Sequence, residues 1–213
     1  SPALGFLAAL FALVPVMMIP MILVQFMLQE KCYNLIEGLR MMGLKYSKYY
    51  LSWLIVYLPL FMLSAAIQTV VMRLINVYPL SDYFLVFLSI SFAGVTMLTW
   101  TFLIVASAKS DANDPEQAKQ GTQGLMFLVT MLGIGAYAGL HFAGASAAAR
   151  TACCLIGYVA AMQSLVSFYD KEINGEGLGW AQLAEGTESG PSLLGCWGFF
   201  LLDGLLYMWL ATS

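Results

Sequence analysis

Charged residues are scarce in this sequence, and their scarcity sets the first limit on the fold. Only 10% of the 213 residues are Asp, Glu, Lys or Arg, whereas 61% are hydrophobic. A soluble domain carries roughly 25% charged residues, so this composition excludes an ordinary globular fold with a hydrated surface. The net charge is −3, and no basic stripe is available to neutralise phosphates, which excludes nucleic acid as a partner.

The motifs of catalysis and metal binding are also absent. The chain has one histidine and four cysteines. The cysteines have no spacing typical of metal ligands, and we interpret them as small buried hydrophobic residues. No G-x-x-x-x-G-K-[ST] phosphate loop occurs, so we expect that this segment does not hydrolyse ATP by itself. We predict no catalytic residue, no metal site and no cofactor within it.

Apolar runs fill the sequence instead. A helix needs ~20 apolar residues to cross ~30 Å of hydrocarbon, and each run is long enough. The alternation typical of a membrane β-barrel is missing. We therefore predict an all-α, polytopic membrane helical bundle, integral and multi-pass, in the plasma membrane or an organelle membrane. The runs cover about residues 3–28, 49–74, 83–108, 121–142, 147–168 and 192–212.

Basic residues in the loops predict the orientation. The charged segment 29–48 holds four of the nine basic residues and should be cytoplasmic. The loop 76–82 has no Lys or Arg, and 169–190 has one lysine against five acids, so both should lie outside. Six full crossings would instead place the acidic loop in the cytoplasm. We therefore predict five spans plus an external re-entrant helical hairpin, with hairpin and loop at about 143–190 and a cytoplasmic C-terminus. Six crossings remain the alternative.

The charged segment has the periodicity of an amphipathic helix. We predict one cytoplasmic helix of about four turns at about 29–46. Glu37 and Arg40 are spaced for an i,i+3 pair, and Gly43 fits a C-terminal stop. Met41 and Leu44 project from the polar side, where a soluble partner could bury them. The apolar arc holds Cys32, Leu35, Ile36, Leu39, Met42 and Gly43, and the polar arc holds Glu30, Lys31, Asn34, Glu37 and Arg40.

The same segment resembles a known family. The residues Glu30-Lys31, then Glu37-Gly38-Leu39-Arg40-Met41-Met42-Gly43-Leu44, then Tyr50-Leu51-Ser52-Trp53 resemble the membrane domain of A-subfamily ABC transporters. There, E-K-x-x-x-x-x-E-G-L-[RK]-M-M-G-L followed by Y-W-L-S-W joins two spans through a cytoplasmic coupling helix. Weaker similarity continues through 168–180 and 202–207, whereas 109–149 matches poorly.

This resemblance implies a type-two ABC exporter that moves lipids. Residues 1–213 would be a single partial transmembrane domain with spans two to six, and we expect the chain to be one piece of a longer polypeptide. The nucleotide-binding domain, with ATP and Mg²⁺, and the external domain would lie outside it. Partners would be membrane lipids, that ATPase domain and a second transmembrane half in the same polypeptide. The residues expected to contact the ATPase domain are Glu30, Lys31, Glu37, Arg40, Met41, Met42 and Leu44.

Two questions stay open in the sequence. The charged segment also fits an interfacial anchor of a non-enzymatic channel or scaffold subunit. Asp203 lies near the middle of the last run, where an unpaired charge is costly, so it should be protonated, partnered or facing an aqueous cavity. It is either functional or a structural hydrogen-bonding group. Gln25, Gln68 and Gln163 are expected to join helices or contact a polar headgroup.

Overall fold

The computed structural model describes residues 2–108, 115–144, 146–186 and 190–212, and in these parts it contains helices and connecting loops but no β-strand. The all-α prediction is therefore confirmed. The elements are α1 (Pro2–Cys32), α2 (Leu35–Met41), α3 (Tyr46–Leu74), α4 (Tyr83–Ser107), α5 (Pro115–Phe142), α6 (Ala147–Cys153), α7 (Gly157–Ile173), the 3₁₀ turn η1 (Trp180–Gln182) and α8 (Leu193–Thr212).

Five of these helices are long and apolar enough to cross a membrane, namely α1, α3, α4, α5 and α8. The sixth apolar run, 147–168, forms no single helix. It divides into α6, with 7 residues, and α7, with 17 residues. At 1.5 Å per residue α7 is only about 25 Å long. Five helices are thus candidate spans, and the sixth run differs from them in kind; the number of crossings stays a prediction.

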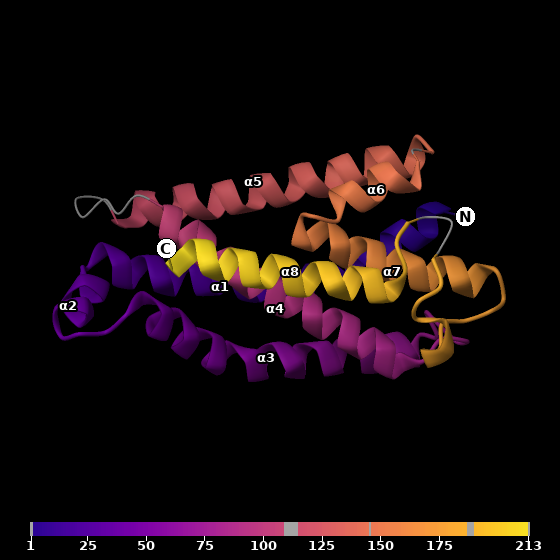
Figure 1. Cartoon of the computed structure of the whole chain (residues 1–213), viewed down its shortest axis with the longest axis horizontal. Helices are drawn as coiled ribbons and strands as arrows, with labels where there is room; N and C mark the ends of the chain where they lie inside the picture. The colour runs from indigo at the N-terminus through magenta and orange to yellow at the C-terminus, as the bar shows by residue number, and fades with distance from the viewer. Residues whose placement is uncertain (1, 109–114, 145, 187–189, 213) are drawn as a thin grey trace.

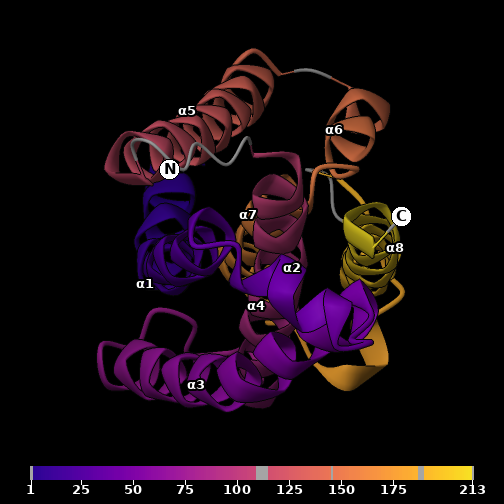
Figure 2. The ribbon, with the colours of Figure 1, turned by 90° about the vertical axis from the view of Figure 1, so that its left-hand side faces the viewer.

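The long helices lie roughly along one axis, with α4 in the centre. Figure 1 shows α2 at one end of the bundle, together with the C-terminus, and the loop before α8 at the other end. In the end-on view of Figure 2, α1, α3 and α8 surround α4, which packs closely against all three and against α7. In the most apolar part of α4, 67% of residues are buried, against 17% in α3. The core of the bundle therefore follows α4.

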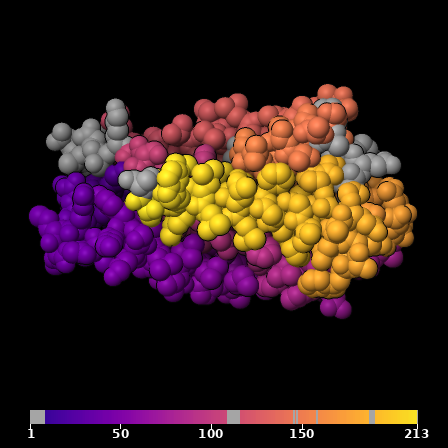
Figure 3. All heavy atoms as spheres, in the orientation of Figure 1, coloured from indigo at the N-terminus to yellow at the C-terminus, as the bar shows by residue number. Residues whose placement is uncertain are grey.

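The α6–α7 segment forms a hairpin. After Gly144, which has φ +65°, α6 runs inward from the end of the bundle opposite α2, and α7 returns to that same end (Figure 1). In Figure 3, α8 crosses the middle of the face of the molecule toward the viewer. The shape is that of a segment that enters and leaves at one end, while its re-entry into a membrane stays a prediction.

A network of hydrogen bonds, which we name the loop clasp, closes the end of the bundle opposite α2. Glu172 of α7 accepts hydrogen bonds from the Leu80 N–H and, at 2.7 Å, from the Ser81 hydroxyl. The Leu178 N–H donates to the Ser81 hydroxyl oxygen at 3.0 Å, and its carbonyl accepts from the Asp82 N–H at 3.0 Å. The members of the loop clasp are Leu80, Ser81, Asp82, Glu172, Leu178 and Trp180.

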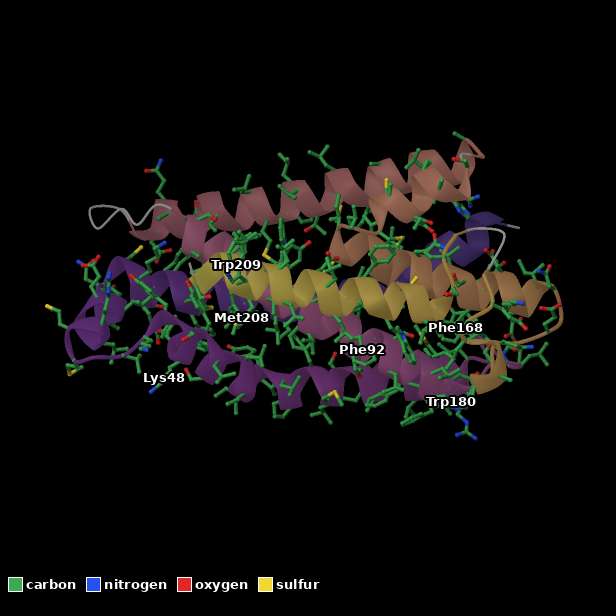
Figure 4. The ribbon with its side chains drawn as sticks, in the orientation of Figure 1. Lys48, Phe92, Phe168, Trp180, Met208 and Trp209 are labelled. Carbon is green, nitrogen blue, oxygen red and sulfur yellow. The ribbon has the colours of Figure 1, made fainter. Side chains whose placement is uncertain are left out.

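Asp82 connects the loop clasp to α4. One carboxylate oxygen accepts from the Phe84 N–H at 2.9 Å and thereby caps the start of α4. The other accepts from the indole N–H of Trp180 at 2.9 Å. Figure 4 places Trp180 at the end of the bundle away from Lys48. Beside the clasp, hydrogen bonds to Glu176 and Glu185 raise the pKa of Lys171.

We predict that Gly177→Ala disrupts the loop clasp. Gly177 has φ +63°, and a Cβ there would lie 2.4 Å from the Leu80 carbonyl oxygen. The strained backbone and the clash together should lower stability by about 2 kcal/mol or more, measured as a lower midpoint of thermal unfolding of the purified protein. Gly186→Ala is the matched control, because nothing lies within 4 Å of its added Cβ. Equal midpoints for both variants would show that the clasp does not need this glycine.

Candidate functional site

The charged segment folds as two helical pieces, so the single helix predicted over 29–46 is wrong. The last turn of α1 contains Glu30 and Lys31 and ends at Cys32. Asn34 then adopts the left-handed conformation, with φ 55°, and α2 begins at Leu35. Asparagine tolerates this conformation better than other non-glycine residues, and it is a known substitute for glycine after a helix C-terminus. The sequence contains this signal, but the hydrophobic periodicity predicted that Asn34 lies inside one continuous helix.

The stop predicted at Gly43 is confirmed. Gly43 has φ 92°, and its N–H donates to the Arg40 carbonyl at 2.8 Å. The Leu44 N–H donates to the Leu39 carbonyl at 3.1 Å. These two bonds form a Schellman motif, which satisfies the last carbonyls of α2. As a result α2 has sharply defined ends, although it is only 7 residues long.

The exposed apolar side chains of α2 differ from those expected. Met41 is 86% exposed, as predicted, and Met42 is 78% exposed. Leu44, predicted to project, is partly buried and packs against the hydrophobic core. The reason is geometric: Met42 is the C-cap residue, and the left-handed turn at Gly43 follows, so a 100° wheel no longer describes the chain. Two adjacent thioethers therefore form the apolar tip of the segment.

The ion pair expected between Glu37 and Arg40 is not formed in the described structure. The Arg40 guanidinium lies 5.3 Å from the centre of the Tyr46 ring at the start of α3, in a cation–π contact. Glu37 is exposed on α2. An exposed i,i+3 pair contributes little free energy, so a nearby aromatic ring competes successfully for the guanidinium.

Glu30 and Lys31 are partly buried, and their charged groups are bonded to neighbouring helices. The Glu30 carboxylate accepts a hydrogen bond from the Tyr49 hydroxyl of α3 at 2.7 Å. The Lys31 ammonium donates to the carbonyls of Val105, Ala106 and Ala108 at the end of α4, at 2.8, 3.0 and 2.6 Å. These two predicted contact residues therefore join α1 to its neighbours.

The four polar residues singled out within the spans do not converge on one site. Gln25 is exposed on the surface of α1. The Gln68 amide donates to the Ser64 hydroxyl on α3 at 3.0 Å. Gln163 of α7 is fully buried and accepts a hydrogen bond from the Tyr137 hydroxyl of α5. Gln163 thus joins two helices, whereas no shared polar site forms.

Asp203 is buried in α8, with 1% of its surface exposed, and neither carboxyl oxygen has a hydrogen-bond partner. The N-terminus of α7 lies beside it: a Cβ on Gly157 would be 3.5 Å from Oδ2 of Asp203 and 2.3 Å from the Thr96 methyl group. The Gly157 N–H donates to the Tyr207 hydroxyl oxygen at 3.4 Å. Because Gly157 has no side chain, the tip of the α6–α7 hairpin can approach the carboxyl group closely.

The five long apolar helices show that this chain is part of an integral, multi-pass membrane protein. The sequence model for the ABC-2 family transporter protein matches residues 2–212, and the chain belongs to this family. It is also 29% identical over 185 residues to the ATP-binding cassette sub-family A member 7 of Mus musculus, a match that covers 86% of this chain and 8% of that protein. The chain therefore spans 8% of the length of this relative.

We predict that Asp203→Asn is tolerated and that Asp203→Lys is not. An unpaired charge buried in hydrocarbon costs several kcal/mol, so the carboxyl group should be neutral, and an amide should change stability by no more than about 1 kcal/mol. A lysine would introduce a charge with no partner. Thermal midpoints and folded yield in detergent measure both effects. A large loss with Asp203→Asn would instead indicate an ionised carboxylate stabilised by the N-terminus of α7.

Proposed function

We propose that this chain is the membrane part of an ATP-driven exporter of lipids, and that α2 is the coupling helix that receives movement from a cytoplasmic ATPase domain. The observation that carries the proposal is the apolar tip of α2. Met41 and Met42 are both more than three-quarters exposed, on a short helix that joins two long apolar ones. Leu35 and Leu39 of α2 are exposed as well, at 53% and 36%, so an anchor in headgroups, which needs a broad apolar face, is the alternative. The two thioethers are the most exposed apolar side chains of the segment, and they suit a pocket on a soluble partner.

The ATPase domain would be a separate part of the transporter. This sequence has no phosphate loop, and the described residues include no group of three or more His, Cys, Asp or Glu able to hold a metal ion. ATP and Mg²⁺ are therefore assigned to a nucleotide-binding domain, the type of partner with which ABC-2 membrane domains work. A second transmembrane half would complete the transporter.

The orientation follows from the loop charges. The end of the bundle with α2 carries Arg40, Lys45 and Lys48 and would be cytoplasmic. The loop clasp and both ends of the α6–α7 hairpin lie at the opposite end (Figure 1), which would be external. On this arrangement, the hairpin enters from the outside to the level of Asp203 and returns. Its α7 arm packs against α1, α4, α5 and α8, which gives that part of the non-spanning backbone the protein surroundings it needs in a membrane.

Lipid as the cargo is supported by a groove between α1 and α3. Its volume is about 640 Å³, within the range of small-molecule sites. Ser64 and Gln68 are the polar residues along an otherwise apolar lining. Since the groove opens on the apolar face of α3, an acyl chain could enter it from the bilayer. The residues that line it on α1 are Phe11, Ala12 and Pro15.

We predict that the double variant Met41→Ser, Met42→Ser uncouples the full-length transporter. The ATPase domain would bury both thioethers, so their loss should weaken docking by about 2 kcal/mol or more. Lipid-stimulated ATP hydrolysis should then fall at least several-fold while ATP binding is unchanged. Leu74→Ser is the matched control, because Leu74 is 77% exposed and ends α3, the helix that begins after α2. Unchanged coupling in the double variant would favour an interfacial anchor in a channel or scaffold subunit.

We predict opposite labelling of the two ends of the bundle. In sealed cells, an impermeant thiol reagent should modify Glu176→Cys and Glu185→Cys from outside, and Met41→Cys only after permeabilisation. All three positions are exposed, so accessibility should depend on sidedness alone. The background is a variant without the native cysteines. Labelling of all three from the same side would show six crossings, with 147–168 as a full span.

A further inference from the structure

The C-terminal end of α4 presents carbonyl groups that can accept hydrogen bonds from another helix. The last four carbonyls of a helix have no intrahelical partner. Among the described residues, the last turn of α4 contains no basic residue, and the Ile104 carbonyl accepts from the Ala108 N–H at 2.9 Å. The carbonyls that follow Ile104 accept from a partner on another helix.

Lys31 of α1 is that partner. An ammonium group has three N–H donors, and all three are used, on the carbonyls of Val105, Ala106 and Ala108. A cation at a helix C-terminus also interacts favourably with the helix dipole. The Lys31 side chain therefore holds the end of α1 against the end of α4 through three charge-assisted hydrogen bonds, each of 3.0 Å or less.

The neighbouring residue makes the corresponding connection to α3. Glu30 accepts from the Tyr49 hydroxyl, and Tyr50 packs against Phe102 of α4 with ring centres 5.2 Å apart. Glu30 and Lys31 lie within one turn of the break at Asn34. Any displacement of α2 must pass this junction to reach the bundle through α1.

Two covalent routes lead out of α2, and they differ in where they end. The turn at residues 42–45 leads to α3, of which only 17% is buried in its most apolar part. The α1 route, through Lys31, leads to α4, which is 67% buried and packs against α1, α3, α7 and α8. A displacement of α4 would therefore also move the helices packed against it. A displacement of α3 would largely be taken up on the side of α3 that faces lipid.

We propose that Lys31 is a positioning residue that transmits movement of α2 to α4. The proposal rests on the proposed function of α2 and assigns it a specific route into the membrane. Removal of the ammonium group leaves α2 and its apolar tip intact. ATP hydrolysis should then continue, while less of the movement of α2 in each ATP cycle is transmitted to the spans.

The test uses the full-length transporter in vesicles, with a fluorescent phosphatidylcholine as cargo. ATP hydrolysis and lipid moved per ATP are measured for the wild type, Lys31→Met, Lys31→Arg and Lys48→Met. Lys31→Met keeps the length of the stem and loses all three donors. Lys31→Arg keeps the charge and several N–H donors. Lys48→Met is the control, because Lys48 is an exposed lysine at the same end of the bundle, pointing away from it in Figure 4.

We expect ATP hydrolysis by Lys31→Met to stay within about twofold of the wild type and lipid moved per ATP to fall about tenfold or more, because one charge-assisted hydrogen bond already corresponds to about tenfold and three are lost. Lys31→Arg should recover most of that loss, and Lys48→Met should match the wild type. A purely structural role would lower hydrolysis and transport in the same proportion, which would overturn the proposal. If Lys31→Met does not fold, Lys31→Gln, which is neutral and keeps two donors, takes its place.

The failure of this proposal differs from that of the proposed function. A wild-type protein that moves no lipid with ATP overturns both. A wild type that does so, with Lys31→Met unchanged in lipid moved per ATP, overturns only the role of Lys31.

Discussion

Helix ends inside an apolar bundle need hydrogen-bond partners, and three polar side chains of this structure supply them. Lipid offers no donors or acceptors, and an unsatisfied backbone group there costs several kcal/mol. Asp82 caps the start of α4, Lys31 satisfies its end, and the Tyr207 hydroxyl receives the first N–H of α7. These three polar side chains are thus used where helices begin and end.

The spans could be predicted from the sequence because hydrophobic length is a local property. A hairpin in place of a sixth span could also be predicted, because the charge rule places the acidic loop 169–190 and the basic segment 29–48 on opposite sides of the membrane. The break at Asn34 was missed, because the hydrophobic periodicity of 30–43 continues through a residue whose backbone conformation interrupts the helix. Hydrophobic periodicity predicts on which side of a helix each residue lies. A single residue in the left-handed conformation changes the direction of the chain, so the prediction fails for the residues that follow it.

The candidate site was predicted less well than the fold, and the reason is that its contacts are long-range. Nothing near Lys31 in the sequence indicates that its partners are Val105 and Ala108, more than 70 residues away. Of the two apolar residues predicted to project, Met41 is exposed and Leu44 is partly buried, and Met42 is exposed in its place. Local signals therefore found the segment, whereas only tertiary structure separated its connecting residues from its exposed ones.

The contacts at the two ends of the bundle both involve α4. One end of this 25-residue helix is held by Lys31 next to α2, and the other by Asp82 in the loop clasp with α7. A helix of this length is about 38 Å long and, when buried against its neighbours, moves as a rigid element. Displacement of the Lys31 end must therefore either carry the loop clasp with it or break hydrogen bonds at one end. The central helix thus connects the contacts at the two ends of the bundle.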